Sequence, residues 1–110
     1  MLETSDRVVT QKRDKAELKI RCSDPEALKI FIERTVAERL RSLSDGIGQT
    51  EDRLQEFEAK YQQSTEEFLR RFNNDELHHT FDFDEWIGES RMLKRLRAKA
   101  EQLKGIEFVD

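Results

Sequence analysis

The residues with the most adaptable chemistry are two adjacent histidines and the carboxylates around them. His78 and His79 lie in a stretch that also holds Asp82 and Asp84. Imidazole and carboxylate groups bind divalent cations, but ligands on a helix must be three or four residues apart to share a face. Neighbouring histidines point in different directions, and Cys22, the single thiol, is far away in the sequence. We therefore expect no metal site and no cofactor.

Catalytic chemistry has little support in the sequence. Acyl transfer and acid–base catalysis need a nucleophile, a base and an orienting group that converge in a pocket. No G-x-S-x-G, P-loop or G-x-G-x-x-G motif is present. The pairs Glu66-Glu67 and Asp84-Glu85 fit the first turn of a helix, where acids complement the helix dipole. Cys22 is expected to be a small buried apolar residue rather than a reactive thiol, and the protein is not expected to be an enzyme.

Charge is sorted along the last third of the chain. An acidic block without Lys or Arg is followed by a basic block that is opposed only by Glu101. The acidic block consists of Asp75, Glu76, Asp82, Asp84, Glu85 and Glu89, and the basic block of Arg91, Lys94, Arg95, Arg97, Lys99 and Lys104. Acids near the start of a helix and bases near its end stabilise the helix dipole. The alternative is that the acidic block contacts a basic protein.

Large apolar side chains lie within the acidic block and are candidates for contact with a protein partner. Aromatic residues dominate protein interfaces, and acids near the contact speed the encounter with a basic partner. The candidate partner-binding residues are Phe83, Trp86, Ile87, Asp82, Asp84 and Glu85. The competing role is a place in the core. For Trp86 the core is favoured, because a helix capped by Asp82 would let Trp86 pack on Phe81 as a hydrophobic staple.

Composition limits the size and the class of the protein. The chain has 110 residues, of which 40% are charged, and a net charge of −4. This length predicts a single domain, residues 1–110, with a core for two or three helices. The negative charge argues against general nucleic-acid binding, and the single Cys fits a reducing cytoplasm. We expect a cytoplasmic protein without membrane contact, because no run approaches the ~20 apolar residues of a membrane span and no secretory signal is evident.

A long helix is predicted over residues 24–63. It begins with Asp24 as N-cap and Pro25 at the first helical position. Its apolar stripe consists of Leu28, Ile32, Val36, Leu40, Leu43, Ile47, Leu54, Phe57 and Tyr61. Two glycines between 45 and 49 cost a helix about 2 kcal/mol together and would allow a break there. The apolar phase continues across them, which favours one long helix, kinked near Gly46.

Two further helices are predicted, over residues 64–73 and 82–104. The first begins at Ser64, with Glu67 completing a capping box. The second begins at Asp82 and ends at Gly105. Its apolar stripe consists of Trp86, Leu93, Leu96, Ala100 and Leu103. The predicted fold class is therefore mainly α, with long amphipathic, coiled-coil-like helices.

The N-terminal residues 1–23 combine a tail with a β-prone segment. Residues 16–22 alternate between apolar and charged side chains, as in a half-buried strand, and residues 7–11 would pair with them in a hairpin. Ile106 and Phe108 would supply a further short strand. The long apolar stripes exceed what one chain of this size buries, so a homodimer is expected.

A strand followed by a capped helix is also how ribbon-helix-helix repressors begin. Outward side chains of a paired ribbon, here Lys19 and Arg21, would then contact the DNA major groove in a transcriptional autoregulator. Glu17 on the same side and the length of the first helix depart from that pattern. The alternatives to a protein-binding module are thus DNA binding and a structural coiled-coil subunit.

Residues 56–103 resemble short prokaryotic proteins of the antitoxin type, from toxin–antitoxin modules. The matching residues are Lys60, Tyr61, Ser64, Glu66, Glu67, Phe68, Phe72, Phe83 and Trp86. The usual Gly-Glu-Leu after the short helix is Asp75-Glu76-Leu77 here, and His78-His79 replaces residues that are more often Gly or Asp. The resemblance implies a helical protein that masks a basic, ribonuclease-like toxin, and it carries over no catalytic residue.

Overall fold

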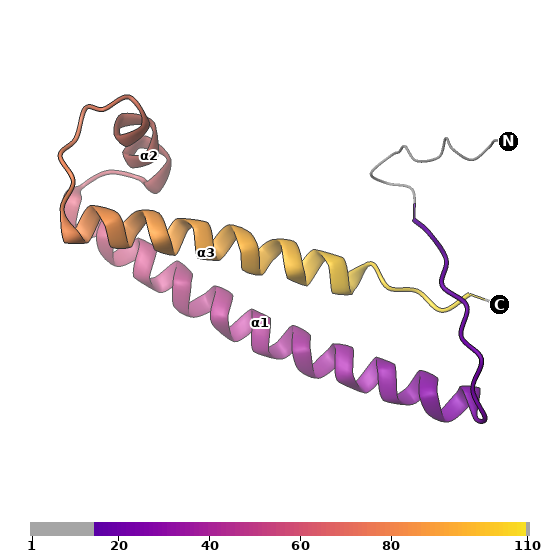
Figure 1. The fold of residues 1–110 in the computed structure, drawn as a ribbon. Coiled ribbons are helices and arrows are strands. Elements are labelled where there is room, and N and C mark those ends of the chain that lie inside the picture. Colours follow the sequence, from indigo (N-terminus) through magenta and orange to yellow (C-terminus); the bar gives the residue numbers. More distant parts are fainter. Residues whose placement is uncertain (1–14, 110) are drawn as a thin grey trace, which may run out of the picture.

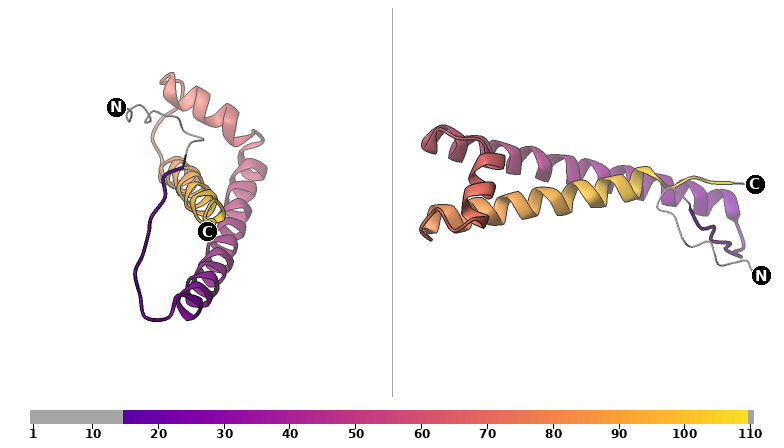
Figure 2. Two further views of the ribbon diagram at one scale, coloured as in Figure 1. Left: turned by 90° about the vertical axis from the view of Figure 1, so that its right-hand side faces the viewer. Right: turned by 90° about the horizontal axis from the view of Figure 1, so that it is seen from above.

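The structure, a computed structural model, describes residues 15–109. These residues form three helices, α1 (Pro25–Tyr61), α2 (Thr65–Asn73) and α3 (Phe81–Lys104). α1 and α3 lie side by side in opposite directions, and the short α2 crosses between them at one end (Figures 1 and 2). The prediction of a mainly helical protein is confirmed for the described residues.

The molecule is much longer than it is thick. Its principal dimensions are 57 × 36 × 17 Å and its radius of gyration is 20.1 Å, whereas a compact chain of this length would have a radius of about 13 Å. We call residues 50–93, which include α2, the closed end. Residues 15–49 and 94–109, which hold both described termini, are the open end (Figure 1).

α1 is one uninterrupted helix of 37 residues. The Asp24 side chain accepts a hydrogen bond from the Ala27 N–H at 3.1 Å, which satisfies an otherwise unpaired donor of the first turn. The helix continues through the glycines between 45 and 49, so no break occurs there. A Cβ at Gly46 would lie 3.4 Å from the Leu96 side chain, and the glycine therefore lets α3 approach closely. At the other end Gln62 adopts a left-handed φ of 54° and stops the helix.

α3 begins one residue earlier than predicted, and its cap is different. The Thr80 side chain accepts from the Phe83 N–H at 3.0 Å, so Thr80 is the N-cap and Phe81 is the first helical residue. The prediction of Asp82 as cap, with Phe81 stapled to Trp86, is wrong: the Phe81 side chain is 94% exposed. The Asp82 carboxylate instead binds side chains of α1.

The predicted N-terminal strand is not formed within the described residues. Residues 15–22 lie outside any helix and form no strand with another segment of residues 15–109. Leu18 is 85% exposed and Ile20 is 56% exposed, because an alternating segment needs both a partner strand and an apolar layer to cover its inner face. The predicted partner, residues 7–11, lies outside the described residues.

Two related expectations at the termini are also wrong. Cys22 is exposed rather than buried, because the segment that carries it packs on no core. Ile106 and Phe108 belong to an irregular C-terminal tail and not to a strand. Gly105 does end α3, but with a φ of −82° that any residue can adopt. No helix within residues 15–109 has the length and apolar character needed to cross a bilayer.

Candidate partner-binding surface

The core lies in the closed end and is mostly aromatic. The Trp86 and Phe68 side chains are completely buried, and their rings stack with centroids 3.9 Å apart at an angle of 2°. Phe57 stacks on Trp86 at 5.5 Å, and the Trp86 Nε1–H donates to Thr65 Oγ1 at 3.0 Å. Trp86 of α3 thus contacts both α1 and α2. It is a core residue, and it is not exposed to a partner.

The other two apolar candidates, Phe83 and Ile87, are half-buried at the edge of this core. The Phe83 ring meets Tyr61 edge-on at 5.1 Å and lies 5.2 Å from the Phe68 ring. Edge-to-face contacts of this kind stabilise an aromatic pair by about 0.5–1.5 kcal/mol beyond burial. Phe83 and Ile87 therefore serve mainly to hold the first turns of α3 against α1 and α2.

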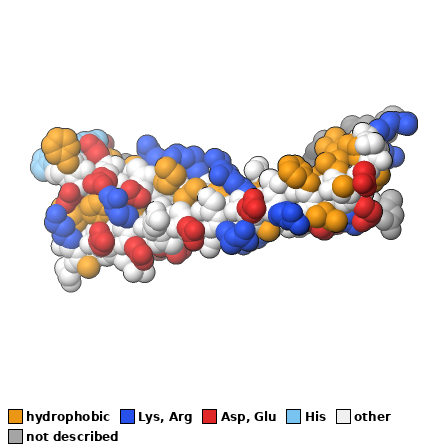
Figure 3. All heavy atoms as spheres, turned by 90° about the horizontal axis from the view of Figure 1, so that it is seen from below, with side chains coloured by type: hydrophobic (Ala, Val, Ile, Leu, Met, Phe, Trp, Pro, Cys, Tyr) orange, Lys and Arg blue, Asp and Glu red, His pale blue; other side chains and the backbone are white. Residues whose placement is uncertain are grey.

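The two ends of the molecule differ in charge. The closed end carries twelve Asp or Glu and five Lys or Arg, whereas the open end carries eight Asp or Glu and twelve Lys or Arg. On the face seen in Figure 3, acidic side chains concentrate over the closed end, and basic ones are most frequent over the middle of the molecule. The acidic end faces away from both described termini (Figure 1).

Asp82 is bound to α1 through two hydrogen bonds. Its carboxylate accepts from Lys60 Nζ at 2.6 Å and from the Tyr61 hydroxyl. The hydrogen bond from Lys60, followed by the one from Tyr61, holds the pKa of Asp82 below its ordinary value. The same hydrogen bonds to Asp82 raise the pKa of both Lys60 and Tyr61. Asp82 therefore joins two helices and is only partly available to a partner.

Further acids of the block pair with α1 in the same way. Arg53 binds Glu85 and lies 3.7 Å from Glu89. Arg53 and Lys60 are seven residues apart on α1, and Asp82 and Glu89 are seven apart on α3, so both sets flank the apolar stripes. This matched spacing was present in the sequence, and it could have predicted that the acids face the bases of α1.

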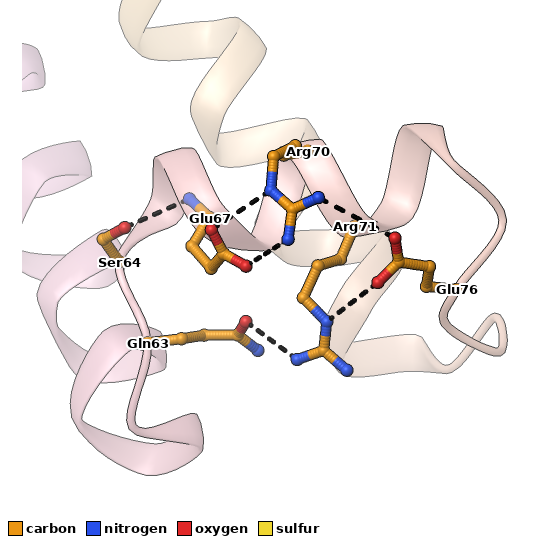
Figure 4. Close-up of polar contacts among 6 residues, drawn as sticks. All are labelled: Gln63, Ser64, Glu67, Arg70, Arg71 and Glu76. Carbon is orange, nitrogen blue, oxygen red and sulfur yellow. Dashed lines mark hydrogen bonds and ion pairs between the residues drawn. The ribbon is translucent and has the colours of Figure 1, made fainter.

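Ion pairs also fix the turn after α2 (Figure 4). The Glu76 carboxylate lies 3.6 Å from Arg71 Nε and 3.8 Å from Arg70 Nη1. Arg70 also binds Glu67, and this hydrogen bond lowers the pKa of Glu67. Ser64 caps α2 as predicted by accepting from the Glu67 N–H, but the Glu67 side chain turns to Arg70 and leaves the capping box half formed. The turn that leads into α3 is thus held in place.

The two histidines have separate surroundings. His79 Nδ1 lies 3.3 Å from Asp84 Oδ1, and the His79 ring meets Phe72 edge-on at 4.8 Å. His78 is exposed. Among residues 15–109, no group of three or more His, Cys, Asp or Glu side chains is arranged to hold a metal ion.

The most exposed aromatic side chain of the closed end is Phe81. On a helix, the residues three, four and seven positions after Phe81 lie on the same face as Phe81. These residues are Asp84, Glu85 and Gly88. Asp84 and Glu85 are exposed, and apart from the nearby backbone of α3 and the residues next to Gly88, nothing lies within 4 Å of the place where a Gly88 Cβ would be. We call Phe81, Asp84, Glu85 and Gly88 the acidic aromatic face. Sequence reasoning missed Phe81 because it assigned this ring to a staple.

The candidate DNA-binding residues do not form a ribbon. Lys19 and Arg21 are exposed on segment 15–22, which pairs with no strand of the described chain. Comparison with protein-family models, curated proteins and solved structures gives no match to this chain.

Proposed function

We propose that this chain is a non-enzymatic protein-binding module that binds a basic protein on the acidic aromatic face. The observation that carries the proposal is Phe81, a phenylalanine that is 94% exposed at the closed end. Full burial of such a ring stabilises a contact by roughly 1.5–3 kcal/mol. Exposed aromatic rings with a polar rim are typical anchors of protein interfaces.

The surrounding charge supports a basic partner. The closed end has a large excess of acids, and acids beside a contact raise the rate of encounter with a positively charged protein. Asp84 and Glu85 share the face of Phe81, with Glu85 also bound to Arg53 and Asp84 3.3 Å from His79 Nδ1, and the Gly88 position leaves open space beside them. A partner side chain can enter there without displacing any side chain of this protein.

The specific form of this function is an antitoxin that neutralises a basic, ribonuclease-like toxin. This step rests on the resemblance of residues 56–103 to antitoxin-type proteins. Several residues of that resemblance, among them Phe68 and Trp86, build the core under α3. They would act indirectly, because they position the first turn of α3, which presents Phe81.

DNA binding is not proposed as a second function. A ribbon reader needs two paired strands to set the spacing of its side chains in the major groove. Lys19 and Arg21 are presented on an unpaired segment, and no other observation favours DNA.

The test is co-expression with the products of the neighbouring genes, followed by titration calorimetry with any product that co-purifies. We expect a complex whose Kd rises at least tenfold in Phe81→Ser and rises with added salt. Phe31→Ser is the control, because it makes the same change at a phenylalanine that is 65% exposed on α1 at the open end, away from the acidic aromatic face. A Kd that Phe81→Ser leaves unchanged, or no complex at all, would contradict the proposal.

A further inference from the structure

Residues 15–22 lie at the open end, outside any helix. The segment runs past the C-terminal tail and clear of both long helices (Figures 1 and 2). No main-chain hydrogen bond joins residues 16–22 to another main-chain group of residues 15–109. Backbone N–H and C=O groups are strong hydrogen-bonding groups, and here a row of them faces solvent. The segment therefore offers its main chain to a partner.

The side chains of this segment alternate between apolar and charged. The apolar set is Leu18, Ile20 and Cys22, and the charged set is Glu17, Lys19 and Arg21. In a β-strand the two sets would lie on opposite faces. All three apolar side chains are exposed. A strand of this kind is stable only where a neighbouring strand pairs with it and an apolar layer covers one face, and residues 15–109 supply neither.

Contacts hold the segment at both of its ends. At one end Lys15 Nζ lies 2.7 Å from the Gly105 carbonyl oxygen and 2.9 Å from the Glu107 carboxylate. At the other end Asp24 caps α1 and Pro25 begins it. Ordering a free segment costs conformational entropy, and this cost weakens binding. Because its ends are held, the segment loses less entropy on pairing than a free arm would.

We infer that residues 16–22 bind by adding as a strand to the open edge of a β-sheet in a partner protein. In this mode of recognition the main-chain hydrogen bonds supply affinity, and the alternating side chains supply specificity. The partner sheet already has two or more strands, because an isolated pair of strands is only marginally stable in water. Its edge presents apolar residues opposite Leu18 and Ile20 and acids opposite Lys19 and Arg21, since opposite charges across a strand pair stabilise it.

The charges of the segment disfavour a second copy of this chain as the neighbouring strand. Antiparallel registers that pair Leu18 or Ile20 with an apolar residue of the second segment are centred on one of residues 17–21. Each of these registers sets one base directly opposite another, and like charges across a strand pair are destabilising. The register centred on Lys19, for example, pairs Glu17 with Arg21 twice but sets Lys19 against its counterpart. An edge strand with acids opposite both bases avoids this conflict.

The inference is independent of the proposed function. Residues 16–22 lie at the open end, whereas the acidic aromatic face lies at the closed end (Figure 1). The core cluster is formed by residues between 54 and 93, so substitutions in the segment remove no side chain from it. A variant that no longer binds through residues 16–22 should therefore still fold, and it should keep any complex formed through Phe81.

The probe is a disulfide-closed β-hairpin peptide whose outer strand reads Val-Glu-Val-Glu-Val-Thr-Val. Paired antiparallel with residues 16–22, this strand places Glu opposite Lys19 and Arg21. Amide hydrogen exchange of the full chain, followed by NMR, reports the pairing residue by residue. We expect slower exchange at alternate amides of residues 16–22 when the peptide is added. A matched hairpin with Lys in place of both Glu should bind at least tenfold more weakly, and equal affinity for the two hairpins would overturn the acidic edge.

The matched variants of the chain place proline or alanine at the same position. Successive N–H groups of a strand point to opposite sides, so either Lys19→Pro or Ile20→Pro removes a hydrogen bond to the hairpin. At least one of them should bind the hairpin at least tenfold more weakly than Lys19→Ala or Ile20→Ala, its counterpart. Unchanged exchange with the Glu hairpin, or equal affinity of the proline and alanine variants at both positions, overturns the inference. Slowed exchange without any peptide, together with a doubled mass in light scattering, also overturns it, because a second copy then pairs with the segment.

Discussion

At the residue scale, the hydrogen bond between Trp86 and Thr65 joins α3 to the start of α2. Thr65→Val keeps the shape of the side chain but leaves the buried Trp86 Nε1–H without an acceptor, since Thr65 Oγ1 is its partner at 3.0 Å. We expect a loss of about 1–3 kcal/mol in the free energy of unfolding. Urea denaturation followed by circular dichroism measures it. Thr65→Ser keeps the acceptor and should lose much less, and equal losses in the two variants would argue against this role for the hydroxyl.

The turn after α2 offers a second prediction at this scale. Asp75 adopts a φ of 58°, and the Glu76 N–H donates to the Arg71 carbonyl at 2.9 Å, as in a Schellman motif. The left-handed conformation costs a residue with a side chain about 1–2 kcal/mol, and glycine adopts it freely. Asp75→Gly should therefore raise the free energy of unfolding by roughly 0.5–1 kcal/mol, net of the added entropy of the unfolded chain.

Asn74→Gly is the matched control for this turn. Asn74 has an ordinary φ of −95°, so the substitution brings only the entropic cost of glycine and should lower stability. The urea midpoints of both variants against wild type decide the matter. If Asp75→Gly destabilises the protein, the Asp75 side chain stabilises the fold by more than its left-handed backbone conformation destabilises it.

At the element scale, the contacts between Asp82 of α3 and the end of α1 predict a pH dependence. The pKa of Asp82 is lowered, chiefly by the hydrogen bond from Lys60 and then by the one from Tyr61. The stability that the ionised Asp82 carboxylate contributes is therefore fully present above the ordinary pKa of an aspartate, and it is lost as the pH falls through the lowered pKa. Lys60 and Tyr61 have raised pKa values, so the stability that these protonated side chains contribute persists until the pH rises through those values. On acidification from pH 5 to pH 2, the Tm of Asp82→Asn should therefore fall by less than the Tm of the wild type.

The measurement is a series of thermal melts across pH 2–7. Asp84→Asn changes an acid on the same helix whose described partner is His79 rather than α1, and it should keep the wild-type acid dependence. If Asp82→Asn and wild type lose the same Tm on acidification, the contact between α1 and α3 at Asp82 does not stabilise the fold.

The helices themselves were predictable, whereas their termini and the contacts between them were less so. Apolar spacing and the caps at Asp24 and Ser64 are local signals, and both residues cap their helices in the structure. Thr80 and Asp82 are both suitable caps by local chemistry, and Asp is the stronger of the two types. The choice between them depends on Lys60 and Tyr61, about twenty residues earlier, and a local pattern does not contain that contact.

The candidate site was predicted only in part for the same reason. The region was identified correctly as aromatic and acidic, but the roles within it depended on packing between helices. Trp86 became core because it stacks on Phe57 and Phe68, and Phe81 was left outside. The alternating segment 16–22 failed as a strand because alternation describes a half-buried surface only where a second strand is present.

At the scale of the whole molecule, burial falls along α1 towards its N-terminal turns. Leu43 is 3% exposed and Ile30 of the same helix is 50% exposed. Leu43→Ala should therefore reduce the free energy of unfolding by about 2–5 kcal/mol, whereas Ile30→Ala should change it by less than ~0.5 kcal/mol. Urea denaturation measures both. Similar losses at the two positions would show that the first turns of α1 are covered more completely than the isolated chain indicates.

Lys15 lies against the C-terminal tail, with its Nζ 2.7 Å from the Gly105 carbonyl oxygen and 2.9 Å from Glu107. The two ends of the described chain are therefore neighbours, and a short linker would join them in a circularly permuted protein with new ends in the loop before α3. A fluorescent domain or purification tag added before Lys15 or after Val109 would crowd the first turns of α1. It would leave the closed end, at the other end of the 57 Å axis, accessible for surface immobilisation assays.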